Sequence, residues 1–204
     1  FEFTESRDRA TRVLKYIANI QVNNPDAKRH QYDTPRFPKA QREVTKQDGL
    51  KLLLDTDGPE AVKEWVLGQK KLLITDTTMR DAHQSLLSTR LRTRDMVKGA
   101  DGTADILADC FSLEMWGGAT FDTAYRFLHE SPWERLEMLR EKIPNIPFQM
   151  LLRGSNLVGY ASYPDNLVRA FIAESAHEGI DVFRVFDSLN WLPNMETAMD
   201  EVLR

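Results

Sequence analysis

Arginine, carboxylate and amide side chains follow the ends of short apolar runs in this sequence. The run KLLIT ends at Thr75, and the polar stretch DTTMRDAHQ occupies positions 76–84 directly after it. The later runs FQMLL and DVFRVF are followed by Arg153 and by Asp187 and Asn190, respectively. Aspartate and asparagine at such points can simply turn or cap the chain, but arginine is not a turn residue. The pattern indicates a binding site for a polar ligand.

Four short apolar runs must position these side chains, and they recur at intervals of about 35 to 40 residues, as successive βα units do. The runs end at Thr75, Met115, Leu152 and Phe186. Between them, Ser131, Pro132 and Glu134 mark the start of a helix, and Gly179 marks the end of another. This alternation predicts a parallel sheet, either open or closed into a barrel, whose carboxyl-terminal rim binds ligands.

The residues before the first run predict helices and a linker. Positions 6–20 carry apolar residues at helical spacing, which predicts an amphipathic helix. Residues 23–46 are polar and interrupted by prolines, which is typical of a linker on a surface. Two short helices are expected at 48–55 and 60–69, separated by a turn at Gly58.

The chain therefore divides into a linker over residues 1–46, a helical lead-in over 47–70 and a series of βα units over 71–204. A complete eightfold barrel usually needs about 250 residues, so this series is long enough for only half of one. Residues 194–204 have a helical pattern without a stop signal. We expect both ends to be cut points and the native chain to continue beyond Arg204.

The composition excludes several classes of partner. The 204 residues are 42% hydrophobic and 28% charged, as in a globular domain, and their net charge is −4, which gives no basic field for nucleic acid. The single cysteine, Cys110, cannot form an internal disulfide, and no apolar stretch is long enough for a membrane span. The first residues lack a secretion signal. These features predict a soluble protein of the cytoplasm or the mitochondrial matrix, with the cytoplasm favoured.

Five motifs, in order, resemble the family of biotin-dependent carboxyltransferases. They are DTTMRDAHQSLLSTR from Asp76, WGGATFD from Trp116, SPWERL from Ser131, MLLRGSNLVGY from Met150 and FRVFDSLNW from Phe183. The match covers nearly everything after Lys71, whereas aldol-type lyases and synthases share only a looser Asp-Thr-x-Arg-Asp core. The resemblance implies an α/β fold, the first half of a TIM (β/α)8 barrel, preceded by a helical linker segment.

The activity that the resemblance implies is transfer of a carboxyl group from carboxybiotin to pyruvate, which forms oxaloacetate. Biotin would be attached elsewhere in the full chain, and ATP and Mg would act in a biotin carboxylase domain outside this sequence. A divalent metal such as zinc or manganese would complete the site. The other metal ligands and a proton-relaying threonine would follow Arg204, so we expect this part to be inactive alone.

The family assigns roles to particular positions. Asp81 would be a metal ligand, with Asp76 supporting it. Arg80, Gln84 and Arg153 would hold pyruvate and stabilise its enolate. Asp122 and Tyr160 match positions that line the biotin pocket, less closely than the others match theirs.

Plainer interpretations stay open for several of these residues. Instead of binding a metal, Asp81 could simply form an ion pair with Arg80. Arg153 could form an ordinary surface ion pair, and Tyr160 could be a core ring. His83 is more often a packing or orienting group than a ligand in such a loop. The tryptophans are interpreted as packing residues, namely Trp116, Trp133 and Trp191.

The stretch DRATRVLKYIANIQVN, from Asp8 to Asn23, resembles the linker between the biotin carboxylase and carboxyltransferase domains of multidomain family members. It implies a homo-oligomer, a tetramer by resemblance, and a region including Arg9 through which an acyl-CoA activator acts. A solvated arginine is an equal alternative for Arg9. Decarboxylase and transcarboxylase subunits typically begin almost at the first motif, so the linker disfavours them.

Two other function classes remain. A metal-dependent aldol-type lyase or synthase would use the same Arg-Asp core but has no use for the upstream linker. A noncatalytic assembly or regulatory segment would use the basic helix near Arg9 but leaves the polar rim without a role. Assays of carboxyl transfer and of acyl-CoA cleavage would separate these classes.

Overall fold

The computed structural model describes residues 11–23, 49–86 and 91–204, and these fall in two units, Phe1–Pro38 and Lys39–Arg204. In the first unit, helix α1 (Arg12–Asn23) begins where the Thr11 hydroxyl oxygen accepts a hydrogen bond from the Leu14 N–H at 3.3 Å. The amphipathic helix is thus confirmed from Arg12, after the cap at Thr11, and the part predicted over residues 6–10 lies outside the described residues.

The second unit is built on a parallel sheet, as predicted. Its strands are β1 (Thr75–Asp76), β2 (Ser112–Trp116), β3 (Phe148–Leu152) and β4 (Val182–Val185), and they lie in the order β1-β2-β3-β4. Each strand pairs in parallel with the next one along the chain. The predicted strand ends are correct to within one residue, although Asp76 and Trp116 belong to strands and do not follow them.

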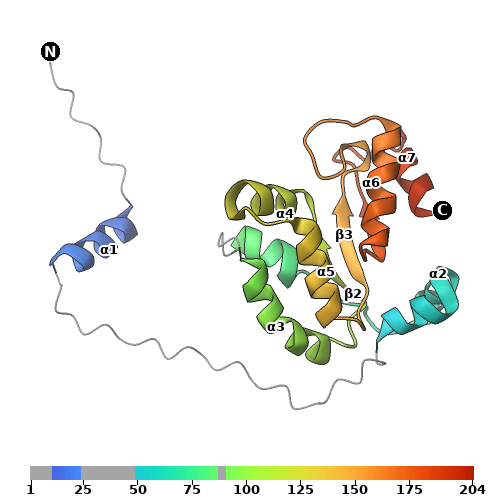
Figure 1. Ribbon diagram of the computed structural model, residues 1–204, viewed down its shortest axis with the longest axis horizontal. Helices are drawn as coiled ribbons and strands as arrows, with labels where there is room; N and C mark the ends of the chain where they lie inside the picture. The colour runs from blue at the N-terminus through green and yellow to red at the C-terminus, as the bar shows by residue number, and fades with distance from the viewer. Residues whose placement is uncertain (1–10, 24–48, 87–90) are drawn as a thin grey trace. The chain divides into compact units, whose positions relative to one another are not determined.

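Helices precede the sheet and connect its strands (Figure 1). The α-helices are α2 (Leu50–Gly68), α3 (Thr93–Ile106), α4 (Gly118–Asp122), α5 (Pro132–Lys142), α6 (Asp165–His177) and α7 (Pro193–Val202). The shorter turns are the π-helices η1 (Thr78–Leu86) and η2 (Thr123–Leu128) and the 3-10 helix η3 (Gly154–Asn156). The last helix runs to Val202, so the helical segment predicted over residues 194–204 is confirmed to within two residues.

Local sequence explains several helix boundaries. The Ser131 hydroxyl oxygen accepts from the Glu134 N–H at 3.4 Å, so α5 starts at the predicted cap. After α6, Gly179 adopts φ 113°, a conformation that favours glycine. In α2, Gly58 has φ 80° and ψ −178° and Pro59 follows it. This break confirms the predicted division of the lead-in into two helical pieces.

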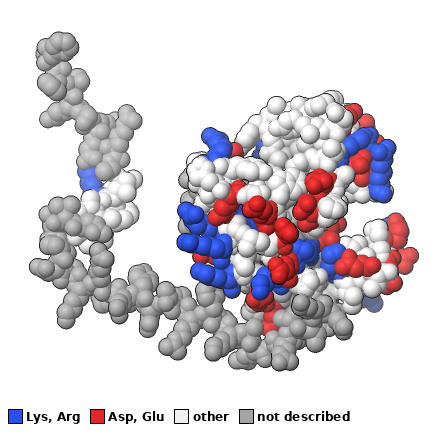
Figure 2. All heavy atoms as spheres, viewed as in Figure 1, with Lys and Arg blue, Asp and Glu red and all other residues white. Residues whose placement is uncertain are grey.

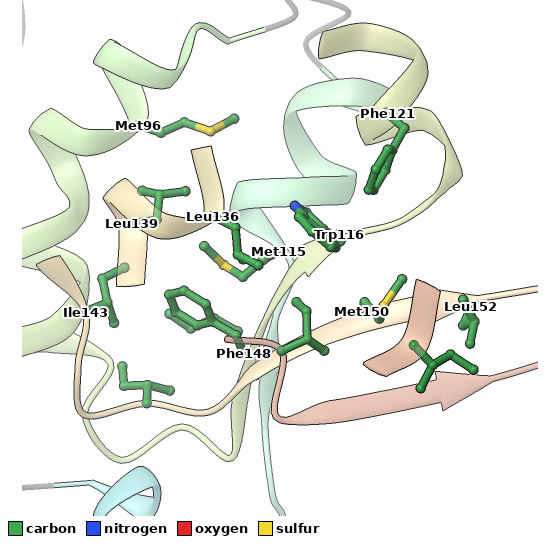
Figure 3. Close-up of a cluster of buried hydrophobic side chains, with 14 of the residues drawn as sticks. Met96, Met115, Trp116, Phe121, Leu136, Leu139, Ile143, Phe148, Met150 and Leu152 are labelled. Atoms are coloured by element: carbon green, nitrogen blue, oxygen red, sulfur yellow. The ribbon is translucent and has the colours of Figure 1, made fainter. Parts of the chain in front are cut away.

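The main core lies between one face of the sheet and the helices (Figure 3). Leu113, Met115, Phe148, Met150 and Leu152 leave the strands on this face and are at most 2% exposed. They pack against side chains of α3, α5, α6 and α7, including Met96, Leu136, Ile172 and Ala198. All four of these helices therefore contribute to a single core.

The register of β2 shifts between Glu114 and Trp116, so that Trp116 also enters the core. Its indole ring meets those of Phe121 and Trp133 edge to face, with centroids 4.9 and 4.8 Å away. The packing roles of Trp116 and Trp133 are thus confirmed. Trp191 is 61% exposed, so the packing role predicted for it is wrong: it lies on an exposed turn after β4.

Acidic and basic side chains are interspersed on the face of the second unit shown in Figure 2, and neither charge dominates that face. In the residues that the structure describes, no helix is long and apolar enough to cross a membrane.

Candidate functional site

Two consecutive glycines after β2 bring the arginines of different loops together. A Cβ atom added to Gly117 would lie 3.1 Å from Cδ of Arg80, and one added to Gly118 would lie 3.4 Å from Nη2 of Arg153. The second Cβ would also lie 3.0 Å from the carbonyl oxygen of Val158. Neither glycine has a positive φ, so close approach and not backbone conformation favours glycine here. Arg80 and Arg153 therefore lie against the same dipeptide.

Arg80 is buried, with 8% of its surface exposed, and its guanidinium group connects two carboxylates. Nη1 donates to Oδ1 of Asp81 at 3.1 Å, and Nη2 donates to Oε1 of Glu114. Its Nε is buried and has no hydrogen-bond partner among the described residues. The ion pair considered from the sequence between Asp81 and Arg80 is therefore present, but Glu114 is the buried partner.

Glu114 was not identified from the sequence. Its side chain is fully buried on the face of β2 that points away from the main core, and it accepts from Gln149 at 3.1 Å and from Arg184 at 2.5 Å. The alternation of apolar and polar residues in SLEM and FQML is the signal that could have found Glu114 and Gln149. The sheet thus has an apolar face and a polar, hydrogen-bonded one.

Arg153 follows β3 and is held by its own loop. Its Nη1 donates to the Gly159 carbonyl oxygen at 3.1 Å, and its guanidinium carbon lies 5.5 Å from the centroid of the Tyr160 ring. Within the described residues Arg153 forms no ion pair with a carboxylate, so the surface ion pair considered for it is not observed. Two arginines thus lie on one rim, Arg80 paired with carboxylates and Arg153 without an ion pair among the described residues.

Tyr160 is 74% exposed, so the alternative that it is a core ring is wrong. Its hydroxyl group donates to Oδ2 of Asp122 at 2.7 Å, and Arg126 lies on the other oxygen at 3.4 Å. The hydrogen bond from Tyr160 lowers the pKa of Asp122, and the same bond raises the pKa of the Tyr160 hydroxyl. The two residues predicted together are therefore in direct contact.

Replacing Tyr160 with Phe should raise the pKa of Asp122 toward its usual value, because the hydroxyl donor stabilises the ionised carboxylate. A pH titration of the Asp122 carboxyl carbon by NMR measures this change. Arg126→Gln is the comparison variant and should also raise this pKa, since it removes both a hydrogen bond and a positive charge from the same carboxylate. An unchanged pKa of Asp122 in Tyr160→Phe would contradict the assignment of this bond.

A cavity of about 290 Å³ opens beside Arg153. Its lining residues are Arg153, Asn156, Tyr160, Phe186, Asp187, Ser188 and Asn194. Asp187 accepts from the N–H groups of Trp191 and Leu189, at 3.0 and 2.8 Å, and these bonds lower its pKa. Asn190 has φ 54° in the same turn. The turn interpretation of Asp187 and Asn190 is confirmed, although Asp187 also reaches the cavity.

The structure describes only part of a possible metal site. Asp81 is partly buried, and Asp76 accepts from the N–H and the hydroxyl of Thr78 at 2.9 and 3.0 Å, which fixes the start of η1. Among the described residues, the group of side chains that could hold a metal lies at the end of α6 and does not include Asp81. The side chains of His83 and Gln84 lie outside the part of the chain that the structure describes, as does Arg9.

Comparisons with known proteins give close relatives, although no model of a protein family matches the chain. The chain is 54% identical over 207 residues to a pyruvate carboxylase of Staphylococcus aureus, which covers 99% of this chain and 18% of the relative. It is 48% identical over 211 residues to the human mitochondrial pyruvate carboxylase, covering 98% of this chain and 17% of the relative. The chain thus spans less than a fifth of the length of these relatives.

Solved structures give the same result. The carboxyl transferase domain of Rhizobium etli pyruvate carboxylase with pyruvate matches with a TM-score of 0.77 and 54% identity, over 81% of this chain and 28% of that one. A structure of the Rhizobium etli enzyme with acetyl coenzyme-A matches with a TM-score of 0.79 and 47% identity, over 100% of this chain and 18% of that one. The chain is therefore a homologue of one segment of the pyruvate carboxylases.

Proposed function

We propose that this chain supplies part of the pyruvate site of a biotin-dependent carboxyl transferase that forms oxaloacetate. The observation that carries the proposal is the pair of arginines, Arg80 and Arg153, packed against Gly117 and Gly118 at the carboxyl-terminal rim of a parallel sheet. The Rhizobium etli relative with pyruvate in its carboxyl transferase domain supports this substrate. A cavity beside Arg153 provides room for a small ligand.

Arg153 would bind the carboxylate of pyruvate through its planar group and stabilise the negative charge that develops as the methyl group loses a proton. Arg80 would add a second positive charge, and Gln84 would donate a hydrogen bond to the same substrate. Their positions on loops after different strands would hold the substrate in one orientation. The residues of this chain thus bind and orient pyruvate and balance its charge.

Tyr160 and Asp122 would line the adjoining biotin pocket. Their mutual hydrogen bond of 2.7 Å and the position of Arg153 over the Tyr160 ring would keep the phenol at the boundary between the two ligands. When bound, biotin supplies the carboxyl group that is added to pyruvate. A relative solved with pyruvate and biocytin supports these two ligands.

Asp81 fits a metal site only in part. Its carboxylate is a suitable ligand for a divalent cation such as zinc or manganese, which would polarise the substrate carbonyl. Among the described residues, Asp81 belongs to no group of three or more carboxylate, histidine or cysteine side chains that could hold a metal. Asp81 would therefore be one ligand of several, and Asp76 would hold its loop.

We also propose that the sheet is the first half of a (β/α)8 barrel. Parallel strands in sequential order, with right-handed connections, place every connecting helix on one face. The single core shared by α3, α5, α6 and α7 supports this arrangement, and the polar face would line the barrel interior. An open doubly wound sheet would need helices on both faces. Residues 1–46 and 47–70 would be the linker and the lead-in.

The proposed function is tested with the full-length enzyme that contains this segment. Oxaloacetate should form from pyruvate, bicarbonate and ATP with Mg, in a reaction that depends on biotin. Cleavage or condensation of an acyl-CoA without carboxyl transfer would instead support an aldol-type lyase or synthase. Biotin-dependent release of carbon dioxide from oxaloacetate without the ATP-dependent direction would support a decarboxylase.

Arg9 tests the regulatory part of the proposal. The motif DRAT at positions 8–11 and a relative described with the activator acetyl coenzyme-A support a role in activation. Because a cation attracts the phosphates of coenzyme A, Arg9→Ala should raise the acetyl-CoA concentration needed for half-maximal rate. Arg12→Ala, on the same stretch, is the control. An activation curve unchanged by Arg9→Ala would remove this role.

A tetrameric assembly and a cytoplasmic location remain predictions. The relatives include a bacterial enzyme and one named as mitochondrial. Size measurements of the full-length enzyme would test the first prediction, and fractionation of the cells that make it would test the second.

A further inference from the structure

A carboxylate lies buried beneath the arginines of the rim. Glu114, on β2, has none of its surface exposed, and a carboxylate in such a place must be paired. Its partners come from three other elements, since Arg80 belongs to η1, Gln149 to β3 and Arg184 to β4. One side chain thus joins four elements of the sheet and its first loop.

The two oxygens of Glu114 have different partners. Oε1 accepts from Nη2 of Arg80, whereas Oε2 accepts from Gln149 at 3.1 Å and from Arg184 at 2.5 Å. The bonds to Oε2 fix the plane of the carboxylate, and Oε1 then fixes one nitrogen of Arg80. Glu114 is therefore oriented by strands and in turn orients a loop residue.

The remaining contacts of Arg80 leave little freedom to its guanidinium group. Nη1 donates to Oδ1 of Asp81 at 3.1 Å. A Cβ atom added to Gly117 would lie 3.1 Å from Cδ of Arg80. The Nε group is buried, has no hydrogen-bond partner among the described residues, and would lie 3.5 Å from a Cβ atom added to Gly117. Arg80 is thus held at two nitrogens by carboxylates and on its third side by the close approach of Gly117.

We propose that Glu114 is a positioning residue, which fixes Arg80 so that its guanidinium faces the 2-oxo acid in the site. This inference rests on the proposed function and names a further residue for it. Glu114 does not touch the substrate and acts through Arg80. Without the Glu114 carboxylate, the Arg80 guanidinium group would be held by Asp81 alone and would rotate toward it. Its orientation toward the substrate would then be lost.

The test uses the full-length enzyme with Glu114→Gln, which keeps the shape of the side chain but removes its charge. The value of kcat/KM for pyruvate should fall about tenfold to a hundredfold, as when an outer partner of a site residue is lost. Glu130→Gln is the matched control, because it breaks another largely buried ion pair, with Arg135 at 3.0 Å, away from the rim. The control should lower the melting temperature but change kcat/KM less than about twofold.

A double-mutant cycle separates positioning from general stability. In an Arg80→Gln background, Glu114→Gln should change kcat/KM for pyruvate by less than about twofold, because its effect passes through Arg80. Independent losses that multiply in the double variant would overturn the proposal. The double variant also removes both charges of the buried pair, which guards against unfolding.

If Glu114→Gln does not fold, Glu114→Asp replaces it, since aspartate keeps the charge but withdraws the oxygens by one methylene. The same loss in kcat/KM is expected, and normal kinetics in a folded Glu114→Asp enzyme would overturn the positioning role. Wild-type enzyme without pyruvate-dependent carboxyl transfer would remove the proposed function and this role together. Wild-type turnover with normal kinetics in the Glu114 variants would remove this role alone.

Discussion

Arg153→Lys should slow oxaloacetate formation by the full-length enzyme about a hundredfold to a thousandfold. Lysine keeps the positive charge but loses the planar fork that binds a carboxylate through two hydrogen bonds. It would also lose the bond that Nη1 donates to Gly159 and the contact with the Tyr160 ring. Steady-state rates of oxaloacetate formation at several pyruvate concentrations measure the loss.

The loss should be selective for the second half-reaction. On the proposed function, bicarbonate-dependent ATP cleavage would occur in another domain, so it should largely survive in Arg153→Lys. Arg169→Lys is the matched control, because Arg169 pairs with Glu201 at 3.0 Å between α6 and α7, away from the cavity. Near-normal oxaloacetate formation by folded Arg153→Lys enzyme would show that Arg153 has a structural role.

Trp116→Ala should lower the free energy of unfolding by about 3 to 5 kcal/mol, as expected for removal of a large buried ring. Trp116 is 1% exposed and contacts the rings of Phe121 and Trp133 edge to face. Trp116 directly precedes Gly117 and Gly118, so the substitution also removes the packed side chain that anchors this glycine pair. Urea unfolding followed by circular dichroism measures the change in stability.

Trp116→Phe is the matched control for this prediction. Phenylalanine keeps an aromatic ring in the same place, and it removes an indole N–H that is buried without a partner among the described residues. Its cost should be about 1 to 2 kcal/mol. Equal losses in Trp116→Ala and Trp116→Phe would mean that the ring contacts contribute little.

Sequence patterns predicted much of the fold because the βα units obey local rules. The cap at Ser131, the break at Gly58 and the helix end at Gly179 depend on residues near each boundary. The apolar run KLLIT predicted a strand longer than β1. In the structure Leu72 and Ile74 are 88% and 57% exposed and lie outside the strand. In the described sheet β1 is an edge strand, with β2 as its neighbour on one side. Apolar composition therefore overestimated the length of this strand.

The site residues that stand in sequence motifs could be predicted, whereas a residue whose role depends on packing could not. Arg80, Arg153, Asp122 and Tyr160 stand in loop motifs, and the structure brings them into contact with each other or with one glycine pair. Glu114 alternates with the apolar residues of β2, which indicates its face of the strand, but its partners Arg80 and Gln149 are distant in sequence. Such partners are known only once the register of the sheet is known.

The order of the strands also has a consequence for how this protein is made on the ribosome. Thr75 pairs with Ser112, Leu113 with Phe148 and Gln149 with Val182, so each new strand pairs with the one synthesised just before it. At about 5 to 20 residues per second, each strand meets a partner within seconds of leaving the ribosome. The growing chain can therefore add one βα unit at a time without waiting for residues made much later.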